Sequence, residues 1–467
     1  MRGVAAVVAL AVAALVCADG AARGGEGAVR LHLDTKTTFQ TWEAWSCEPN
    51  PPGYERAFGA WCRNPARETY DRVPMNDRLP SRLIGRMHDA LVSDIGITRV
   101  RLEVGPQVEP VNDDDDPAHT VESAYRWTWQ DDQLERHVLP LKKRIEAAGE
   151  RMVVYVSYDL RSKLTPAFLL RPEEYAEMAV AFLAHVKSKY GFVPDWWSVL
   201  NEPGNDRPGD PKLCAEMTAA TGRRIAAAGF ATRMSGPECV TVAQADTYIK
   251  AMAATPGALD RFGQITYHLY HGGAEDVASR NAVRDWAKKL HVSAAQTEWM
   301  EGKDLDVARH IHLCLTEADA TAWDRFGADL FFAMPYDEWL DPANDAKTPL
   351  LSSTAWHIRQ FSHWIRPGAV RVALTGATGT VRGVAFLPKP RAASPAPLPV
   401  IVLLNASDAA QSVVIDGVPP GKYGVTFTSE PQRAHGRPLP DAEAGASGEL
   451  AIELAPRSVT TLAAPGP

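Results

Sequence analysis

Two glutamates, Glu202 and Glu298, each stand at the end of a short apolar run. Glu202 lies in DWWSVLNEPG (residues 195–204), where Pro and Gly force the chain to turn directly after the run. Glu298 ends VSAAQTE (residues 292–298) and is followed by an aromatic residue. A carboxylate at the end of a buried strand is costly unless water, a partner or a substrate satisfies it. Two carboxylates on one rim, one protonated and one ionised, are what hydrolysis of a glycosidic bond requires.

The order of elements along the chain predicts how the two glutamates come together. Eight short apolar runs alternate with helical patterns, as a (β/α)8 TIM barrel of class α/β demands, and active sites of such barrels lie at the carboxyl ends of the strands. The two glutamates are 298 − 202 = 96 residues apart, which leaves room for two intervening strand–helix units. The expected strands are 39–45, 97–104, 151–159, the run ending at Glu202, 231–239, 264–270, the run ending at Glu298, and 329–334.

The composition of the sequence changes from Arg371 onward. Short runs rich in Val and Leu are divided there by Gly, Pro and Ser, at residues 381–387, 398–405, 411–415, 423–428 and 450–454. This pattern is typical of an all-β sandwich. We therefore predict three parts: a signal peptide at 1–22, a catalytic barrel at 39–365, and a C-terminal β-sandwich side domain made of 28–36 plus 369–467.

Composition restricts the class of partner. The chain has 467 residues with 45% apolar content and a formal net charge of −8, which is ordinary for a globular protein. A negative net charge argues against nucleic acid or an anionic membrane surface as the partner, and suits a neutral or weakly cationic ligand. The 13 Trp residues are many for this length, and Trp can stack on sugars as well as fill a core.

The N-terminus predicts export. A charged start, Met1-Arg2, precedes an apolar run to Val16 and then small residues, which describes a secretory signal peptide and a secreted or periplasmic protein. A lipid anchor on Cys17 is the alternative. The apolar run is too short for a membrane span, and no other candidate span follows.

The cysteines predict a disulfide and no metal site. In an exported protein, Cys47 and Cys62 could pair across one loop, and Cys214 with Cys239 more weakly, which leaves Cys314 free. No zinc-ligand spacing is present. The acidic run at 113–116 is interpreted as a solvated loop, with a metal site as the alternative.

Four stretches resemble glycoside hydrolase family 30, within the large clan of retaining (β/α)8 glycosidases. FQTWEAW (39–45), WSVLNEP (197–203) and TEW (297–299) look like the family's opening strand, acid/base strand and nucleophile strand. HIRQFSHWIRPGA (357–369) looks like its link into the β side domain and is the most family-specific of the four. The resemblance spans about residues 28–465. The opening strand departs from the family pattern, because EAWSC (43–47) stands where glycines are usual.

The resemblance implies a retaining β-glycoside hydrolase that acts on a polysaccharide or glycoconjugate and needs no cofactor. Glu202 would be the general acid/base, and Glu298 the nucleophile that forms a covalent glycosyl-enzyme. The alternatives are a structural glutamate that caps the next helix at Glu202, and a surface loop glutamate at Glu298.

Several further residues are candidates for substrate binding or for support of the carboxylates. The clan resemblance implies that Asn201 hydrogen-bonds the hydroxyl next to the anomeric carbon, with a turn-forming Asn as the alternative. Arg101 could keep the nucleophile ionised by charge pairing, or form an ordinary salt bridge. His268 and Tyr270, at the end of one expected strand, fit partners for the catalytic carboxylates, or a satisfied core His and Tyr.

Aromatic and polar residues near other strand ends complete the candidate set. Trp339, Trp45 and Trp299 are candidate stacking surfaces for sugar rings, with core packing as the alternative for each. Tyr158 and Asp159 could contact sugar hydroxyls.

Two other functions remain open from the sequence. One is a non-catalytic carbohydrate-binding protein that kept the glycosidase fold, because fold does not fix function. The other is an enzyme from another family of the same clan. Family members act on xylan, glucosyl lipids, or β-1,6-linked glucan or galactan, so the resemblance does not name the sugar.

Overall fold

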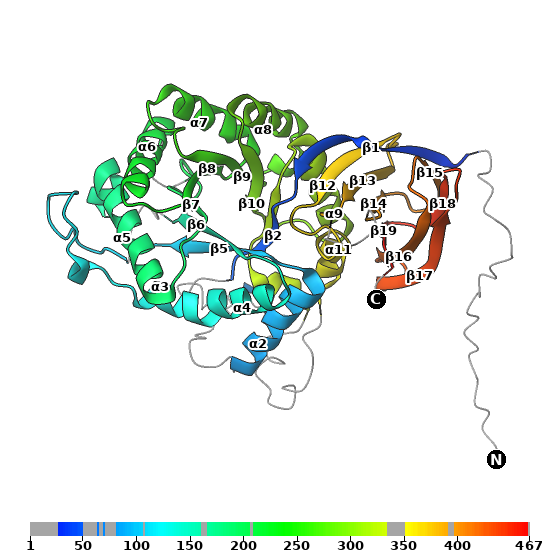
Figure 1. The fold of residues 1–467 in the computed structure, drawn as a ribbon, viewed down its shortest axis with the longest axis horizontal. Coiled ribbons are helices and arrows are strands. Elements are labelled where there is room, and N and C mark those ends of the chain that lie inside the picture. The colour runs from blue at the N-terminus through cyan, green and yellow to red at the C-terminus, as the bar shows by residue number, and fades with distance from the viewer. Residues whose placement is uncertain are drawn as a thin grey trace, which may run out of the picture.

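The molecule consists of a barrel and a β-sandwich that lie side by side (Figure 1). The computed structural model describes residues 27–49, 63–64, 69–70, 81–105, 108–159, 166–205, 209–333, 351–390 and 397–465. The predicted signal peptide at 1–22, together with Cys17, Cys62 and Trp339, lies outside these residues.

Eight parallel strands close the barrel, and this confirms the predicted TIM barrel. In the order of the closed sheet they are β2 (Ala44–Cys47), β5 (Arg99–Val104), β6 (Val153–Tyr158), β7 (Trp196–Ser198), β8 (Arg233–Cys239), β9 (Phe262–His268), β10 (Ser293–Glu298) and β11 (Ala322–Arg325).

Helices surround the barrel strands, and together the two layers bury a continuous apolar core. The helices are α2 (Ser81–Ala90), α3 (Thr128–Gln133), α4 (Leu139–Ala147), α5 (Pro172–Tyr190), α6 (Pro211–Ala227), α7 (Val242–Ala254), α8 (Val277–Leu290), α9 (Leu305–Glu317) and α11 (Ser353–Ser362). A two-stranded hairpin of β3 (Arg63–Asn64) and β4 (Thr69–Tyr70) follows β2 in the chain.

The eighth strand was predicted in the wrong place. It is β11, four residues with the sequence AWDR, whereas residues 328–331 form a short 3₁₀ turn instead of the expected strand at 329–334. The two charged residues of AWDR make this segment look unlike a buried strand. It forms one because the interior of the barrel is itself polar. Asp324 is buried 3.8 Å from the guanidinium of Arg99, and burial raises the pKa of Asp324 to about 6.

The first barrel strand also differs from the prediction. Residues 39–41 end β1 (Val29–Thr41), which belongs to the side domain, and the barrel begins only at β2. Between the two strands, the backbone of Trp42 bonds to Ala369 rather than to a barrel strand. One apolar run therefore contains the end of one sheet and the start of another.

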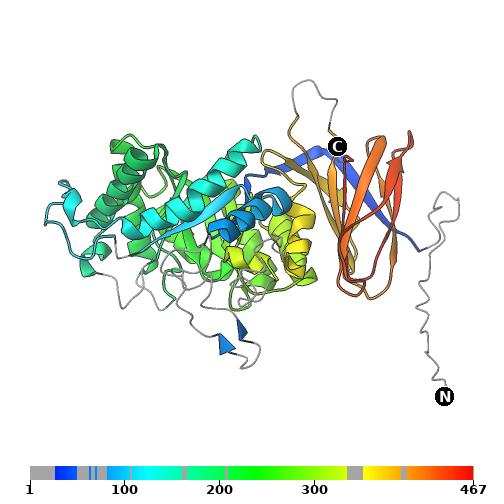
Figure 2. The same ribbon diagram turned by 90° about the horizontal axis from the view of Figure 1, so that it is seen from below.

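The side domain is a β-sandwich, as predicted (Figure 2). The five strands expected after Arg371 are present, and β12, β17 and β19 join them. β1 lies between β12 and β15, antiparallel to the first and parallel to the second. The strands after the barrel are β12 (Val370–Thr375), β13 (Val381–Leu387), β14 (Val400–Asn405), β15 (Gln411–Asp416), β16 (Gly421–Ser429), β17 (Ala434–Ala444), β18 (Leu450–Leu454) and β19 (Ser458–Ala463).

Helix α11 joins the two parts through a buried amide. The side-chain nitrogen of Gln360 donates to Thr428 at 3.0 Å, and its oxygen accepts from Thr426 at 3.1 Å and from Thr461 at 2.7 Å. Gln360 is fully buried. Because a buried amide without partners is costly, this satisfied network favours one orientation of the sandwich on the barrel.

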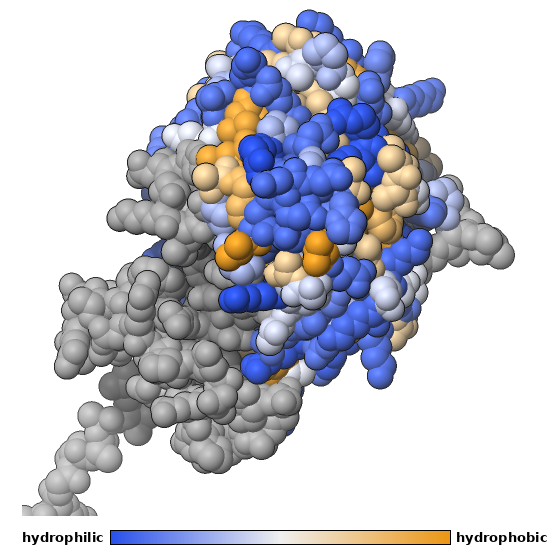
Figure 3. Space-filling view, turned by 90° about the vertical axis from the view of Figure 1, so that its left-hand side faces the viewer, coloured by the Kyte–Doolittle hydropathy of each residue, from blue (hydrophilic) through white to orange (hydrophobic). Residues whose placement is uncertain are grey.

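The barrel face opposite the side domain is mainly hydrophilic, with small separate hydrophobic groups (Figure 3). Among the described residues, no helix is both long enough and apolar enough to cross a membrane. Cys214, Cys239 and Cys314 are buried free thiols, so the weaker predicted pairing of Cys214 with Cys239 is wrong. The pairing of Cys47 with Cys62 stays a prediction.

From two buried histidines we expect the free energy of unfolding to decrease at acidic pH. His137 approaches His88 of α2 at 3.4 Å, and burial lowers the pKa of both imidazoles, to about 4 for His137. Because the unfolded chain binds these protons more readily, stability falls as pH decreases from the ordinary pKa near 6.5. We expect His137 alone to cost about 2 kcal/mol of unfolding free energy between pH 7 and pH 5.

Urea unfolding at the two pH values measures this cost. His137→Gln should reduce the difference between pH 7 and pH 5, whereas His32→Gln, on the exposed face of β1, should leave it unchanged. An equal pH dependence in wild type and His137→Gln would contradict the assignment.

Candidate active site

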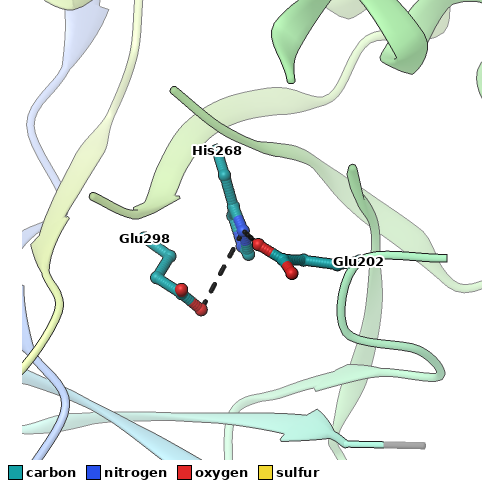
Figure 4. Close-up of side chains that lie close together, drawn as sticks. All are labelled: Glu202, His268 and Glu298. Atoms are coloured by element: carbon teal, nitrogen blue, oxygen red, sulfur yellow. Dashed lines mark hydrogen bonds and ion pairs between the residues drawn. The ribbon is translucent and has the colours of Figure 1, made fainter. Parts of the chain in front are cut away.

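The two glutamates meet at one end of the barrel. Glu298 is the last residue of β10, Glu202 follows β7, and a carboxylate oxygen of each lies within 4.8 Å of the other. His268, at the end of β9, stands between them, with Nδ1 3.0 Å from Glu202 and 3.9 Å from Glu298 (Figure 4). Both carboxylates are 7% exposed, so the pair is largely shielded but still reachable.

Two side chains contact the carboxylate of Glu298: Tyr270, which follows β9, by a hydrogen bond, and Arg101 of β5 by an ion pair. The hydroxyl of Tyr270 donates to Oε1 at 3.0 Å, and Nη1 of Arg101 lies 2.9 Å from Oε2. Burial and the charge of Glu298 raise the pKa of Tyr270 well above its ordinary value, so the phenol keeps its proton. A cation and a hydroxyl donor both favour the ionised form of a carboxylate.

Arg101 is the centre of the site. Its guanidinium is fully buried, and the surrounding carboxylates raise its pKa despite the opposing effect of burial. Each nitrogen has at least one partner. The partners are Glu48, Glu103 and Glu298 at Nη1, Glu238 at Nε, and Ser157 and Asn201 at Nη2, all between 2.9 and 3.2 Å.

Glu238, at the end of β8, is a buried carboxylate that the sequence reasoning missed. It accepts from Arg101 and from the hydroxyl of Ser157, and it lies 3.8 Å from Nε2 of His268. Burial raises its pKa, but Arg101 and His268 outweigh burial and hold the pKa at about 2. A carboxylate near a strand end was the signal used for Glu202, and GPEC (236–239) carried the same signal.

Glu202 and Glu238 share an unusual backbone conformation. Their φ angles are 48° and 52°, in the left-handed region that residues other than glycine rarely occupy. Glu202 follows β7 and Glu238 lies near the end of the adjacent strand β8, and the backbone nitrogen of Glu202 donates to the carbonyl of Glu238 at 3.1 Å. Such conformations cluster at functional sites, where the surrounding structure over-determines them.

Among the described residues, three groups of side chains lie close enough together to hold a cation: Glu202 and Glu298 with His268, and two groups that already contact an arginine. Glu48, Glu103 and Glu298 converge within 4.8 Å of one another, and Nη1 of Arg101 contacts all three. A metal ion at that place would have to displace the guanidinium nitrogen.

A second such group lies on the surface. It consists of Glu275, Asp306 and His310, and there Arg309 contacts both acids. The same competition with an arginine therefore applies at this place.

The aromatic candidates that the structure describes are buried side chains. Trp45 faces the helical layer, where its indole donates to the carbonyl of Ile365 at 2.8 Å and its ring packs against Phe361. It is therefore a core residue and not a stacking surface.

Trp299 and Tyr158 pack into the protein in the same way, and each is at most 2% exposed. Trp299 packs edge-on against His310, and Gly302 lies so close to its ring that a Cβ there would collide with it. Tyr158 packs against Tyr175. Asp159 is buried at the end of β6, and the role of Trp339 stays a prediction.

Comparison with known proteins supports the fold. Models of known protein families gave no match to this chain, and neither did curated protein sequences. Among solved structures, a family GH30 endoxylanase from Clostridium papyrosolvens is similar with a TM-score of 0.65 and 16% identity, over 93% of this chain and 99% of that chain.

Two further structures have the same overall arrangement. Xylanase C of family GH30 from Talaromyces cellulolyticus gives a TM-score of 0.66 at 18% identity, over 93% of this chain and 99% of that chain. An endo-β1,6-glucanase gives 0.60 at 15%, over 93% of each chain. At such identities the likeness concerns the fold, and it confirms the predicted fold resemblance to glycoside hydrolase family 30.

The geometry predicts a histidine that stays charged at neutral pH. Burial alone would lower the pKa of His268, but the carboxylates of Glu298, Glu202 and Glu238 outweigh it and raise the pKa to about 9. NMR titration of the imidazole nitrogens should therefore find the doubly protonated ring throughout pH 6 to 8. Glu238→Gln should lower this pKa, because it removes a carboxylate that lies 3.8 Å from Nε2 of His268. A wild-type ring that deprotonates near pH 6.5 would contradict the assignment.

Proposed function

We propose that this protein is an exported retaining β-glycoside hydrolase that cleaves a polysaccharide or glycoconjugate. The observation that carries the proposal is the separation of Glu202 and Glu298, whose nearest oxygens lie within 4.8 Å of each other. Retaining enzymes place their two carboxyl groups about 5–5.5 Å apart, whereas inverting enzymes leave about 6.5–9.5 Å for a water molecule. The fold shared with glycosidases adds support.

In the first step, an oxygen of Glu298 attacks the anomeric carbon while the glycosidic bond breaks. Glu202 gives its proton to the leaving oxygen, so the aglycone departs neutral and Glu202 becomes ionised. The product is a glycosyl ester of Glu298. Arg101 and Tyr270 hold Glu298 in place before the attack, because they contact its two different oxygens.

In the second step, Glu202 acts as a base. It removes a proton from a water molecule, whose oxygen attacks the anomeric carbon and releases Glu298 as a carboxylate. The change of role follows from charge. While Glu298 is ionised, repulsion between like charges favours the protonated form of Glu202, and once Glu298 is esterified that repulsion is gone. His268 contacts Glu202 at 3.0 Å and orients it.

Substrate binding draws on the same network. The side-chain oxygen of Asn201 accepts from Arg101 at 2.9 Å, which fixes the amide plane. We assign to its nitrogen a hydrogen bond to the sugar hydroxyl beside the anomeric carbon. The chemistry uses only carboxylates and hydrogen-bond donors of the chain, and the substrate is a carbohydrate.

Glu298→Gln should abolish hydrolysis, because the amide is a poor nucleophile. We expect kcat to fall by about 10⁴-fold or more on a panel of β-glycans and dinitrophenyl β-glycosides. A fluorinated β-glycoside that traps the glycosyl-enzyme should add its mass to the peptide that contains Glu298 in the wild type and not in the variant.

Glu317→Gln, on α9, is the matched control for this change, because Glu317 pairs with Arg280 outside the site. It should keep wild-type activity. Hydrolysis that is unaffected by Glu298→Gln would remove the nucleophile assignment, and absence of any hydrolysis or trapping by the wild type would remove the proposed function.

Glu202→Gln should separate the two steps. With a dinitrophenyl leaving group, which needs no proton, the first step should persist while the second slows, so that a burst of phenolate precedes slow turnover. With a natural glycan, kcat should fall by about 10²–10⁴-fold because the leaving oxygen needs the proton. Equal losses on both substrates would argue against the acid/base role.

A further inference from the structure

Glu48 is a buried carboxyl group for which the proposed mechanism has no role. It follows β2 at the floor of the site and is 1% exposed. Its Oε2 accepts from Nη1 of Arg101 at 3.1 Å. Its Oε1 is also buried, and no donor reaches it among the described residues. A buried carboxylate oxygen without a donor is costly, so the protonation state of this group needs an explanation.

The neighbours of Glu48 are mostly acidic. One oxygen of Glu48, one of Glu103 and one of Glu298 lie within 4.8 Å of one another, and Nη1 of Arg101 lies 3.1, 3.2 and 2.9 Å from the three acids. A single guanidinium nitrogen cannot neutralise three carboxylates in a buried site. A proton on one of the three would relieve the repulsion between them.

Hydrogen-bond donors, nearby charges and burial indicate which of the three acids carries the proton. Glu298 accepts a hydrogen bond from Tyr270 in addition to its ion pair with Arg101. Glu48 has only Arg101 among the described donors, and Asp159 adds a further negative charge to its surroundings. Burial first, and then the charge of Glu103, raise the pKa of Glu48 well above its ordinary value.

We propose that Glu48 is a positioning residue, an uncharged acid that carries the single proton of the Glu48–Glu103 pair and holds Arg101 against Glu298. The inference depends on the proposed function, because it gives Glu48 a part in orienting the nucleophile. Between them, Glu48 and Glu103 carry one negative charge, which leaves most of the attraction of Nη1 to Glu298. Two ionised acids would compete with Glu298 for the same nitrogen.

Substitutions that mimic the two protonation states test the role. Glutamine has the shape of the protonated acid, so Glu48→Gln should lose no more than about tenfold in kcat, whereas Glu48→Ala should lose at least about a hundredfold with little change in KM. Glu103→Gln should also be mild, because Glu48 then becomes the anion. The double glutamine variant leaves Arg101 without that charge and should lose more than the product of the single losses.

Dinitrophenyl β-glycosides serve as the substrate for all variants, and Glu453→Gln, on the exposed side of β18, is the control that should keep full activity. If Glu48→Gln loses as much as Glu48→Ala, Glu48 acts as an anion and the inference is wrong. If neither Glu48→Gln nor Glu48→Ala loses activity, Glu48 has no positioning role. If the losses of the double variant are only the product of the single losses, Glu48 shares no proton with Glu103.

Infrared spectroscopy gives a test that does not need turnover. In the Glu202→Gln background, the wild-type Glu48 should contribute a protonated-carboxyl carbonyl band at neutral pH, and Glu48→Gln should remove it. An unchanged band would overturn the inference even if Glu48→Ala fails to fold. A wild type that neither hydrolyses nor is trapped would instead count against the proposed function, whereas the band would still report on the proton.

Discussion

A single buried guanidinium organises this site. Arg101 contributes one positive charge at the centre of the barrel, and four carboxylates, an amide oxygen and a hydroxyl lie within 3.2 Å of its nitrogens. Removing a charge from water costs several kcal/mol unless hydrogen bonds and counter-charges compensate. Here every nitrogen has a partner, and the partners come from β5, β6, β8 and β10 and from the segments that follow β2 and β7.

Closure of the barrel is what makes this arrangement possible. Asn201 and Glu298 are far apart in the chain, yet the parallel strands place their carboxyl ends on one rim. The interior below the rim is polar as well, since Arg99 meets Glu43 and Asp324 there, where branched apolar residues usually fill such a barrel. Burial and charge pairing thus extend from the rim to the lower end of the strands.

The sequence predicted the residues that stand visibly at strand ends. Glu202, Glu298, His268 and Tyr270 were found because each follows a recognisable apolar run. Arg101 was found for its place in a strand, although its number of acidic partners was not foreseen.

Other residues and elements were missed because local sequence patterns indicate them weakly or not at all. Glu238 belongs to the strand RMSGPEC, whose Gly and Pro are unusual within a strand. Glu48 follows a strand of only four residues. The sequence left both roles of Trp45 open, because a strand buried on both faces gives no alternation to tell inside from outside. AWDR was missed because its aspartate faces a buried arginine, which is a tertiary fact that no local pattern contains.

The position of β1 has a consequence for synthesis of the chain on the ribosome. This strand is made early, before the whole barrel, but its partners β12 and β15 begin at residues 370 and 411. Its edges must therefore stay unpaired while more than three hundred residues are translated. The lysine, the histidine and the threonines of β1 make its unpaired edges less prone to aggregate than those of an apolar strand would be.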